Sequence, residues 1–140
     1  MINNNRMKNL SFSGLVFLLI IGTWSCNSTT NKEEIANTSD QVEAYYFHFT
    51  ARCATCKGVE AETRANLAAL YGDKVPFQSV NLDEESGKAI GDKFQIGSQA
   101  LVIVKGSTKI DITNEGFLYA LNDPEKFRTI IKEKVDPLLN

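Results

Sequence analysis

The sequence predicts an α/β fold with three layers, in which a central mixed sheet of about four strands is flanked by helices. Over residues 41–140, short segments rich in aromatic and β-branched residues alternate with amphipathic segments. The predicted order is strand, helix, strand, helix, strand, strand, helix. Alternating strands and helices favour parallel pairing of the first strands, and a glycine turn at residues 105–107 favours a hairpin between the last two.

The first strand is predicted at residues 42–49, a run short and apolar enough for a buried central position. Its aromatic side chains are expected in the core, and they are Tyr45, Tyr46, Phe47 and Phe49. A helix then runs from Cys53 toward Tyr71, and Gly72 ends it. Its apolar face carries Val59, Leu67 and Leu70.

A second strand is predicted at residues 75–82. The acids Asp83, Glu84 and Glu85 follow it and suit the start of a short helix, because the helix N-terminus favours negative charge. The spacing of these acids does not suit a calcium site. The inward residues of this helix are expected to be Ala89, Ile90 and Phe94.

The third and fourth strands are predicted at residues 100–104 and 108–113, with Ile110 and Ile112 on one face. A helical turn is expected at residues 117–121. Asp123 is a capping residue and Pro124 suits the first position of a final helix. Its buried stripe is expected to contain Phe127, Ile130, Ile131 and Val135.

The composition favours one soluble domain with an appendage. The chain has 140 residues, of which 43% are hydrophobic and 23% are charged, and its formal net charge is −2. Because the sequence contains no basic run, nucleic-acid binding is not expected.

The appendage is the N-terminal segment. Arg6 and Lys8 precede an uncharged, mostly apolar stretch at residues 10–24, which is typical of a secretory signal. Residues 22–26 resemble a bacterial lipoprotein box, which implies cleavage after residue 25 and lipid attachment at Cys26. The alternative is an uncleaved membrane anchor. We therefore expect a signal peptide at 1–25, a polar tether at 26–40 and a domain at 41–140, which faces the periplasm or the exterior from a bacterial cell envelope.

Two cysteines spaced C-x-x-C, Cys53 and Cys56, mark the expected active site. Cys53 falls at the helix start, where the helix dipole and the neighbouring cation Arg52 both favour a thiolate. Cys53 is thus the predicted nucleophile, and Cys56, one turn into the helix, is the predicted resolving thiol. Lys57 either adds to the positive field or lies in solvent, and Arg52 has the same alternative of a solvated loop residue.

The cysteine pair at the opening of the first helix, Lys57 after it and the spacing to residues 101–106 resemble the thioredoxin fold family over nearly all of residues 41–140. The chain is also similar to small Bacteroidetes-type lipoproteins named ArsF-like. Thioredoxins carry a cis-proline that faces the cysteines, and the matching position, at or next to Ala100, has none. They also bury an acid in the first strand, where the aligned residue here is Phe47, and they carry an aromatic residue at the position of Arg52.

The resemblance implies a thiol–disulfide oxidoreductase that acts on protein disulfide or dithiol clients and exchanges electrons with a membrane carrier, without an organic cofactor. The alternative is a non-catalytic binding or accessory module that keeps the pair as a structural or sensing disulfide. No metal is expected, because a zinc site needs about four ligands and the pair adds only one histidine, His48. His48 is either a hydrogen-bonded strand residue or a proton relay to the cysteines.

Overall fold

The computed structural model describes residues 40–140, which contain four strands and four α-helices. In chain order the elements are β1 (Glu43–His48), α1 (Ala54–Tyr71), the 3-10 helix η1 (Gly72–Lys74), β2 (Phe77–Asn81), α2 (Glu85–Phe94), β3 (Ala100–Lys105), β4 (Thr108–Asp111), α3 (Thr113–Tyr119) and α4 (Pro124–Leu139). The predicted signal peptide, Cys26 and all but the last residue of the predicted tether lie outside the described residues. Within residues 40–140, no helix is both long and apolar enough to cross a membrane.

The strands form one mixed sheet in the order β2-β1-β3-β4. β1 runs parallel to β2, which the crossover through α1 allows, and antiparallel to β3. β3 and β4 form an antiparallel hairpin whose turn places Gly106 at a φ of +56°, a conformation that glycine adopts without strain. The predicted α/β fold with a mixed sheet of four strands is confirmed.

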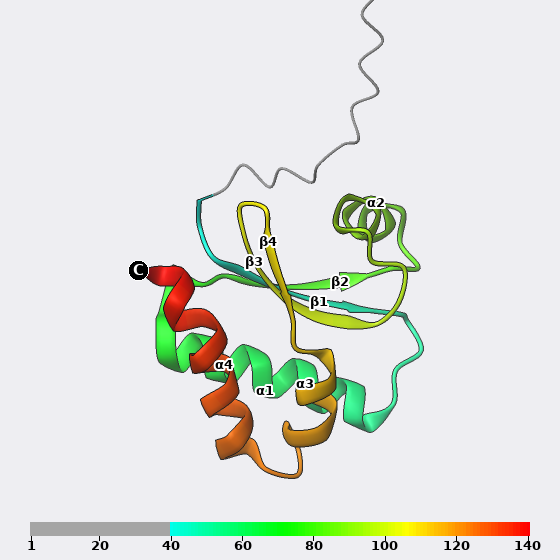
Figure 1. The fold of residues 1–140 in the computed structure, drawn as a ribbon. Helices are drawn as coiled ribbons and strands as arrows, with labels where there is room; N and C mark the ends of the chain where they lie inside the picture. The colour runs from blue at the N-terminus through cyan, green and yellow to red at the C-terminus, as the bar shows by residue number, and fades with distance from the viewer. Residues whose placement is uncertain (1–39) are drawn as a thin grey trace, which may run out of the picture. The chain divides into compact units, whose positions relative to one another are not determined.

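Helices cover both faces of the sheet, with α2 on one face and α1, α3 and α4 on the other (Figure 1). Because side chains alternate along a strand, β1 contributes to both layers. Ala44 and Tyr46 point toward α1, α3 and α4, whereas Tyr45 and Phe47 point toward α2. All four are buried. β1 is therefore the central strand, as its sequence predicts.

The helix faces that pack on the sheet are mostly those expected. Phe127, Ile131 and Val135 of α4 are fully buried, while Ile130 is half-buried. Asp123 caps α4 by accepting a hydrogen bond from the Lys126 amide at 3.1 Å. On α1, Val59 and Leu67 are buried and Leu70 packs against the same cluster.

The inward face of α2 differs from the prediction. Ala89 is exposed, and the buried positions beside Phe94 are Gly87 and Gly91. A Cβ atom on Gly87 would lie 1.9 Å from the carbonyl oxygen of Asn81. The helix thus approaches the end of β2 so closely that position 87 has to lack a side chain.

Two further predictions are wrong. Phe49 is 40% exposed rather than part of the core, because β1 ends at His48 and the chain leaves the sheet there. The fourth strand ends at Asp111, and α3 begins at Thr113 instead of near residue 117. Thr113 fixes this start, since its amide donates to Asp111 Oδ1 and its hydroxyl accepts from the Leu101 amide, both at 2.8 Å.

The close approach of α2 leads to a stability prediction. Gly87→Ala should lower the free energy of unfolding by about 1–3 kcal/mol, because backbone rather than a flexible side chain occupies the space of the new methyl group. Gly97→Ala is the matched control, since nothing lies within 4 Å of a Cβ there, and it should change stability by less than about 1 kcal/mol. Urea unfolding followed by circular dichroism measures both; equal midpoints would contradict the packing argument.

Candidate active site

The first cysteine is the N-cap of α1. Cys53 has an extended backbone, and its Sγ accepts a hydrogen bond from the Cys56 amide at 3.3 Å. The first backbone bond of the helix, from Lys57 N–H to the Cys53 carbonyl, is 3.2 Å long. The sulfur of Cys53 therefore lies at the positive end of the helix dipole, and its side chain is exposed. Cys53 and Cys56 are both free thiols.

The loop that carries Cys53 is tied to the turn between β2 and α2. The Thr50 amide donates to Asp83 Oδ2 at 2.7 Å, and the Asn81 side chain donates to Thr50 Oγ1 at 3.0 Å. Hydrogen bonds from the backbone and side chain of Thr50 hold the pKa of Asp83 below its usual value. Asp83 thus stabilises the cysteine loop, whereas the sequence suggested that it serves the start of α2.

The second cysteine lies one turn inside α1 and is buried, at 7% exposure. Its thiol faces Gln99 Oε1 at 3.7 Å. Gln99 Nε2 donates to the hydroxyl of Tyr46, which in turn donates to the Cys56 carbonyl at 3.0 Å. Cys56, Gln99 and Tyr46 thereby form a closed ring of hydrogen bonds, which we call the Cys56 ring.

The Cys56 ring affects two titrating groups. Burial alone would raise the pKa of the Cys56 thiol, but hydrogen bonds with Cys53 and the backbone lower it below the usual value. Burial raises the pKa of Tyr46 to about 12, against a lowering contribution from Gln99. Tyr46 is consequently a hydrogen-bond donor at neutral pH rather than a base.

The sequence did not predict that Tyr46 contacts the cysteine site, and the strand residue that it assigned to that position was Phe47. Phe47, the residue aligned with the buried acid of thioredoxins, points to the opposite face of the sheet, beneath α2. The strand residue that faces α1 and the cysteines is Tyr46. The alternation of side chains, counted from a residue known to face α1, would have identified it.

The position that matches the proline of thioredoxins was expected at or next to Ala100. Ala100 packs into the cluster under α2, while the neighbouring Gln99 reaches the cysteine. Among residues 40–140 no peptide bond is cis. A polar residue directly before a buried strand was the available signal for Gln99, because its side chain needs a partner there.

Arg52 pairs with Glu60 on α1. Glu60 also accepts from Arg64 at 3.2 Å. Burial raises the pKa of Glu60, but hydrogen bonds from Ser79 and the two arginines outweigh it and hold that pKa below its usual value. Arg52 therefore ties the cysteine loop to the side of α1, a contact that the sequence did not predict. Lys57 is exposed.

His48 has the contacts of a hydrogen-bonded strand residue. Its Nδ1 lies 2.9 Å from the Phe49 carbonyl and its Nε2 lies 3.0 Å from Ser79 Oγ. Since a carbonyl only accepts, Nδ1 is the donor in the contact with Phe49. These two contacts are to Phe49 and Ser79 rather than to a cysteine.

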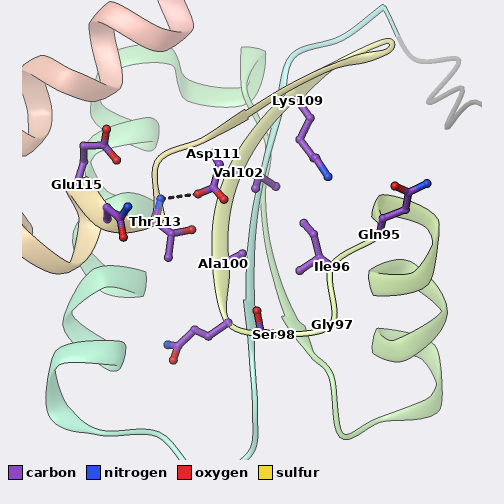
Figure 2. A pocket seen from close by; sticks show the side chains of 12 residues that line it. Gln95, Ile96, Gly97, Ser98, Ala100, Val102, Lys109, Asp111, Thr113 and Glu115 are labelled. Carbon is purple, nitrogen blue, oxygen red and sulfur yellow. Dashed lines mark hydrogen bonds between the residues drawn. The ribbon is translucent and has the colours of Figure 1, made fainter.

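A groove of about 600 Å³ opens beside Gln99 (Figure 2). Its walls come from residues 95–100 before and within β3, from Lys109 and Asp111 of β4, and from residues 113–115 of α3. Polar groups dominate the rim, and Lys109 is held by the Phe94 carbonyl at 2.7 Å. Residues 40–140 contain no group of three or more His, Cys, Asp or Glu side chains that could hold a metal ion.

The ion pairs of Glu60 lead to a pH prediction. A carboxyl whose pKa is depressed by folding adds stability above its unfolded pKa and loses it as the pH falls. Glu60→Gln should therefore reduce the free energy of unfolding by about 1 kcal/mol near pH 7 and by less near pH 4. Urea unfolding at the two pH values tests this. Glu133→Gln, at an exposed position of α4, is the control; a loss at Glu60 that is independent of pH would contradict the assignment.

No protein-family model and no curated protein sequence matches the chain. Solved structures do match it. Thioredoxin O2 from Arabidopsis thaliana, in its oxidised state, has a TM-score of 0.52 at 18% identity, over 71% of this chain and 82% of that one. Thioredoxin f2 from Chlamydomonas reinhardtii has a TM-score of 0.48 at 20% identity, over 71% and 84% of the two chains. The thioredoxin Deadhead from Drosophila melanogaster has a TM-score of 0.47 at 18% identity, over 67% and 81%.

At these identities the likeness concerns the fold. The mixed sheet in the order β2-β1-β3-β4, the helices on both of its faces and the match to the Arabidopsis thioredoxin together establish a thioredoxin-like α/β fold for this chain.

Proposed function

We propose that this chain is a thiol–disulfide oxidoreductase that uses Cys53 and Cys56. The observation that carries the proposal is the asymmetry of the pair at the start of α1. Cys53 is exposed and accepts a hydrogen bond from the Cys56 amide, whereas Cys56 is buried one turn behind it. An exposed sulfur can meet a client, and a buried one can resolve the complex without reacting first.

In the reductive direction, the Cys53 thiolate attacks one sulfur of a client disulfide. The client S–S bond breaks, its second sulfur leaves as a thiolate, and a mixed disulfide with Cys53 forms. The Cys56 thiolate then attacks Cys53 Sγ and expels the first client sulfur. The client gains two electrons and two protons, and the pair becomes a disulfide. The reverse sequence oxidises a dithiol client.

The proposed setting is a bacterial cell envelope. The apolar segment and Cys26 support a lipid-anchored protein of the ArsF-like type whose domain faces the periplasm or the exterior. Continued turnover would then need electron exchange with a partner, for which a membrane electron carrier is the proposed class. No organic cofactor enters the scheme, since two thiols carry both electrons.

The second candidate is a non-catalytic binding module. It is favoured by the neighbours of Cys56, because neither Gln99 nor Tyr46 can accept its proton at neutral pH. In such a module the pair would be a structural or sensing disulfide, and partner binding would not depend on Cys53.

Cysteine substitution distinguishes the two candidates. The full-length chain with Cys26→Ser, which removes the third thiol, should accelerate the reduction of insulin by dithiothreitol. Adding Cys53→Ser should abolish this acceleration. Adding Cys56→Ser should instead trap a mixed disulfide with the client, visible by mass spectrometry, because the resolving sulfur is missing. Undiminished insulin reduction after Cys53→Ser, or no trapped complex, would contradict the oxidoreductase assignment.

The reduction potential of the pair decides the direction of electron flow. Equilibration with glutathione or dithiothreitol followed by mass spectrometry measures it. A potential of about −270 mV is typical of thioredoxin-like reductants, and a potential of about −120 mV is typical of disulfide-forming oxidants. A pair that stays oxidised throughout would support the binding module.

A further inference from the structure

Gln99 contacts the buried thiol with a group that both donates and accepts. A carboxamide carries an acceptor oxygen and a donor nitrogen on one planar group. Its Oε1 lies 3.7 Å from Cys56 Sγ and can accept from the thiol, while Nε2 donates to the hydroxyl of Tyr46. Tyr46 completes the Cys56 ring by donating to the Cys56 carbonyl at 3.0 Å. In this orientation of Gln99, the protonated thiol of Cys56 has an acceptor for its hydrogen.

The resolving step needs the other form of Cys56. A buried thiolate is costly unless donors face it, and an amide oxygen faces Cys56 in the present orientation. A half-turn of the Gln99 carboxamide about its last side-chain bond exchanges the two ends. Nε2 then donates to the thiolate, and Oε1 accepts from the Tyr46 hydroxyl. Each hydrogen-bonding group of Gln99 and Tyr46 keeps a partner in both orientations.

We propose that Gln99 is a positioning residue for the resolving step, which stabilises Cys56 both as thiol and as thiolate by reversing its carboxamide against Tyr46. The proposal rests on the proposed function. In that step the Cys56 thiolate attacks Cys53 Sγ, and an S–S bond forms between the two cysteines. The bond from Cys53 to the client breaks, and the electron pair leaves on the client sulfur, which takes up the proton that Cys56 gave up.

The charged groups nearby are engaged elsewhere. Arg52 and Glu60, whose charges act on Tyr46, form an ion pair with each other. Cys53, before α1, hydrogen-bonds with the Cys56 thiol. In the groove beyond Gln99 the titratable groups are Lys109, Asp111 and Glu115. Lys109 donates to the Phe94 carbonyl. Asp111 accepts from Thr113, as Figure 2 shows. The Gln99 carboxamide thus contacts the Cys56 thiol directly, whereas the charged side chains named above have other partners or line the groove.

The decisive measurement is the pKa of Cys56 as the single thiol of the chain. The full-length protein with Cys26→Ser and Cys53→Ser is titrated by the ultraviolet absorbance of its thiolate. Gln99→Met keeps the side-chain length and removes both polar atoms, so it should raise this pKa by about one unit or more, a tenfold loss of thiolate at a given pH. Tyr46→Phe should give a smaller rise, because Gln99 loses its partner but keeps its contact with Cys56.

Gln95→Met is the matched control, since it makes the same exchange at an exposed position of the same groove. It should leave the pKa of Cys56 unchanged. If Gln99→Met does not fold, as judged by circular dichroism, Gln99→Glu replaces it. That variant should raise the pKa further, because a carboxylate cannot donate and repels a thiolate. A Cys56 pKa that is the same in the Gln99 variant as in Gln95→Met would overturn the proposal.

The titration requires neither a client nor turnover. It therefore separates the failure of this inference from the failure of the oxidoreductase assignment. A raised pKa without any insulin reduction would keep the role of Gln99 and reject the enzyme. Insulin reduction with an unchanged pKa would keep the enzyme and reject the role of Gln99.

Discussion

The position of β1 is the constraint on which the site depends. It is paired on both edges, with β2 and β3, and its side chains are buried on both faces. A strand held in this way has no freedom to slip, because a shift by one residue would exchange the contents of its two layers. Its end at His48 therefore fixes where the cysteine loop leaves the sheet, and its Tyr46 fixes the depth at which Cys56 lies. The hydrogen bond from Thr50 to Asp83 attaches the loop to the turn between β2 and α2 as well.

The charges of the site are kept away from the buried sulfur. Arg52, Glu60 and Arg64 form a partly exposed ion-pair network along the side of α1. The groups that hydrogen-bond with the Cys56 thiol are the Cys53 side chain, the Gln99 carboxamide and the backbone. Burial and hydrogen bonds, which act in opposite directions, thus set the proton affinity of Cys56. This differs from the acid that thioredoxins bury beneath their cysteines, and it makes the orientation of a single amide matter more than it otherwise would.

The sequence predicted the order of the elements because hydrophobic periodicity, the cap at Asp123 and the turn at Gly106 are local signals. It also located the cysteine pair at the start of α1. The contacts around the pair could not be predicted in the same way, because they join residues far apart in the chain. Tyr46 and Phe47 point to opposite faces of the sheet, so an alignment error of one residue assigns the wrong side chain to the cysteine face. Hydrophobic periodicity pointed to Ala89 as an inward residue of α2, but the tight contact is made at Gly87, which has no side chain that could contribute to such a pattern. Arg52 finds its partner eight residues away across the loop-to-helix junction, beyond the reach of helical spacing rules.

The position of α2 on the sheet leaves space for the groove beside Gln99. Because its glycines let it pack closely at the end of β2, it covers the β1 and β2 side of the sheet, and the groove lies where β3, β4 and the start of α3 meet. Gln99 belongs to both regions, since it lines the groove and hydrogen-bonds with Cys56. A client segment that filled the groove would contact the same carboxamide that contacts the Cys56 thiol. Under the proposed function, the binding of a client and the protonation of Cys56 would therefore act on the same side chain, at the position where thioredoxins carry a proline.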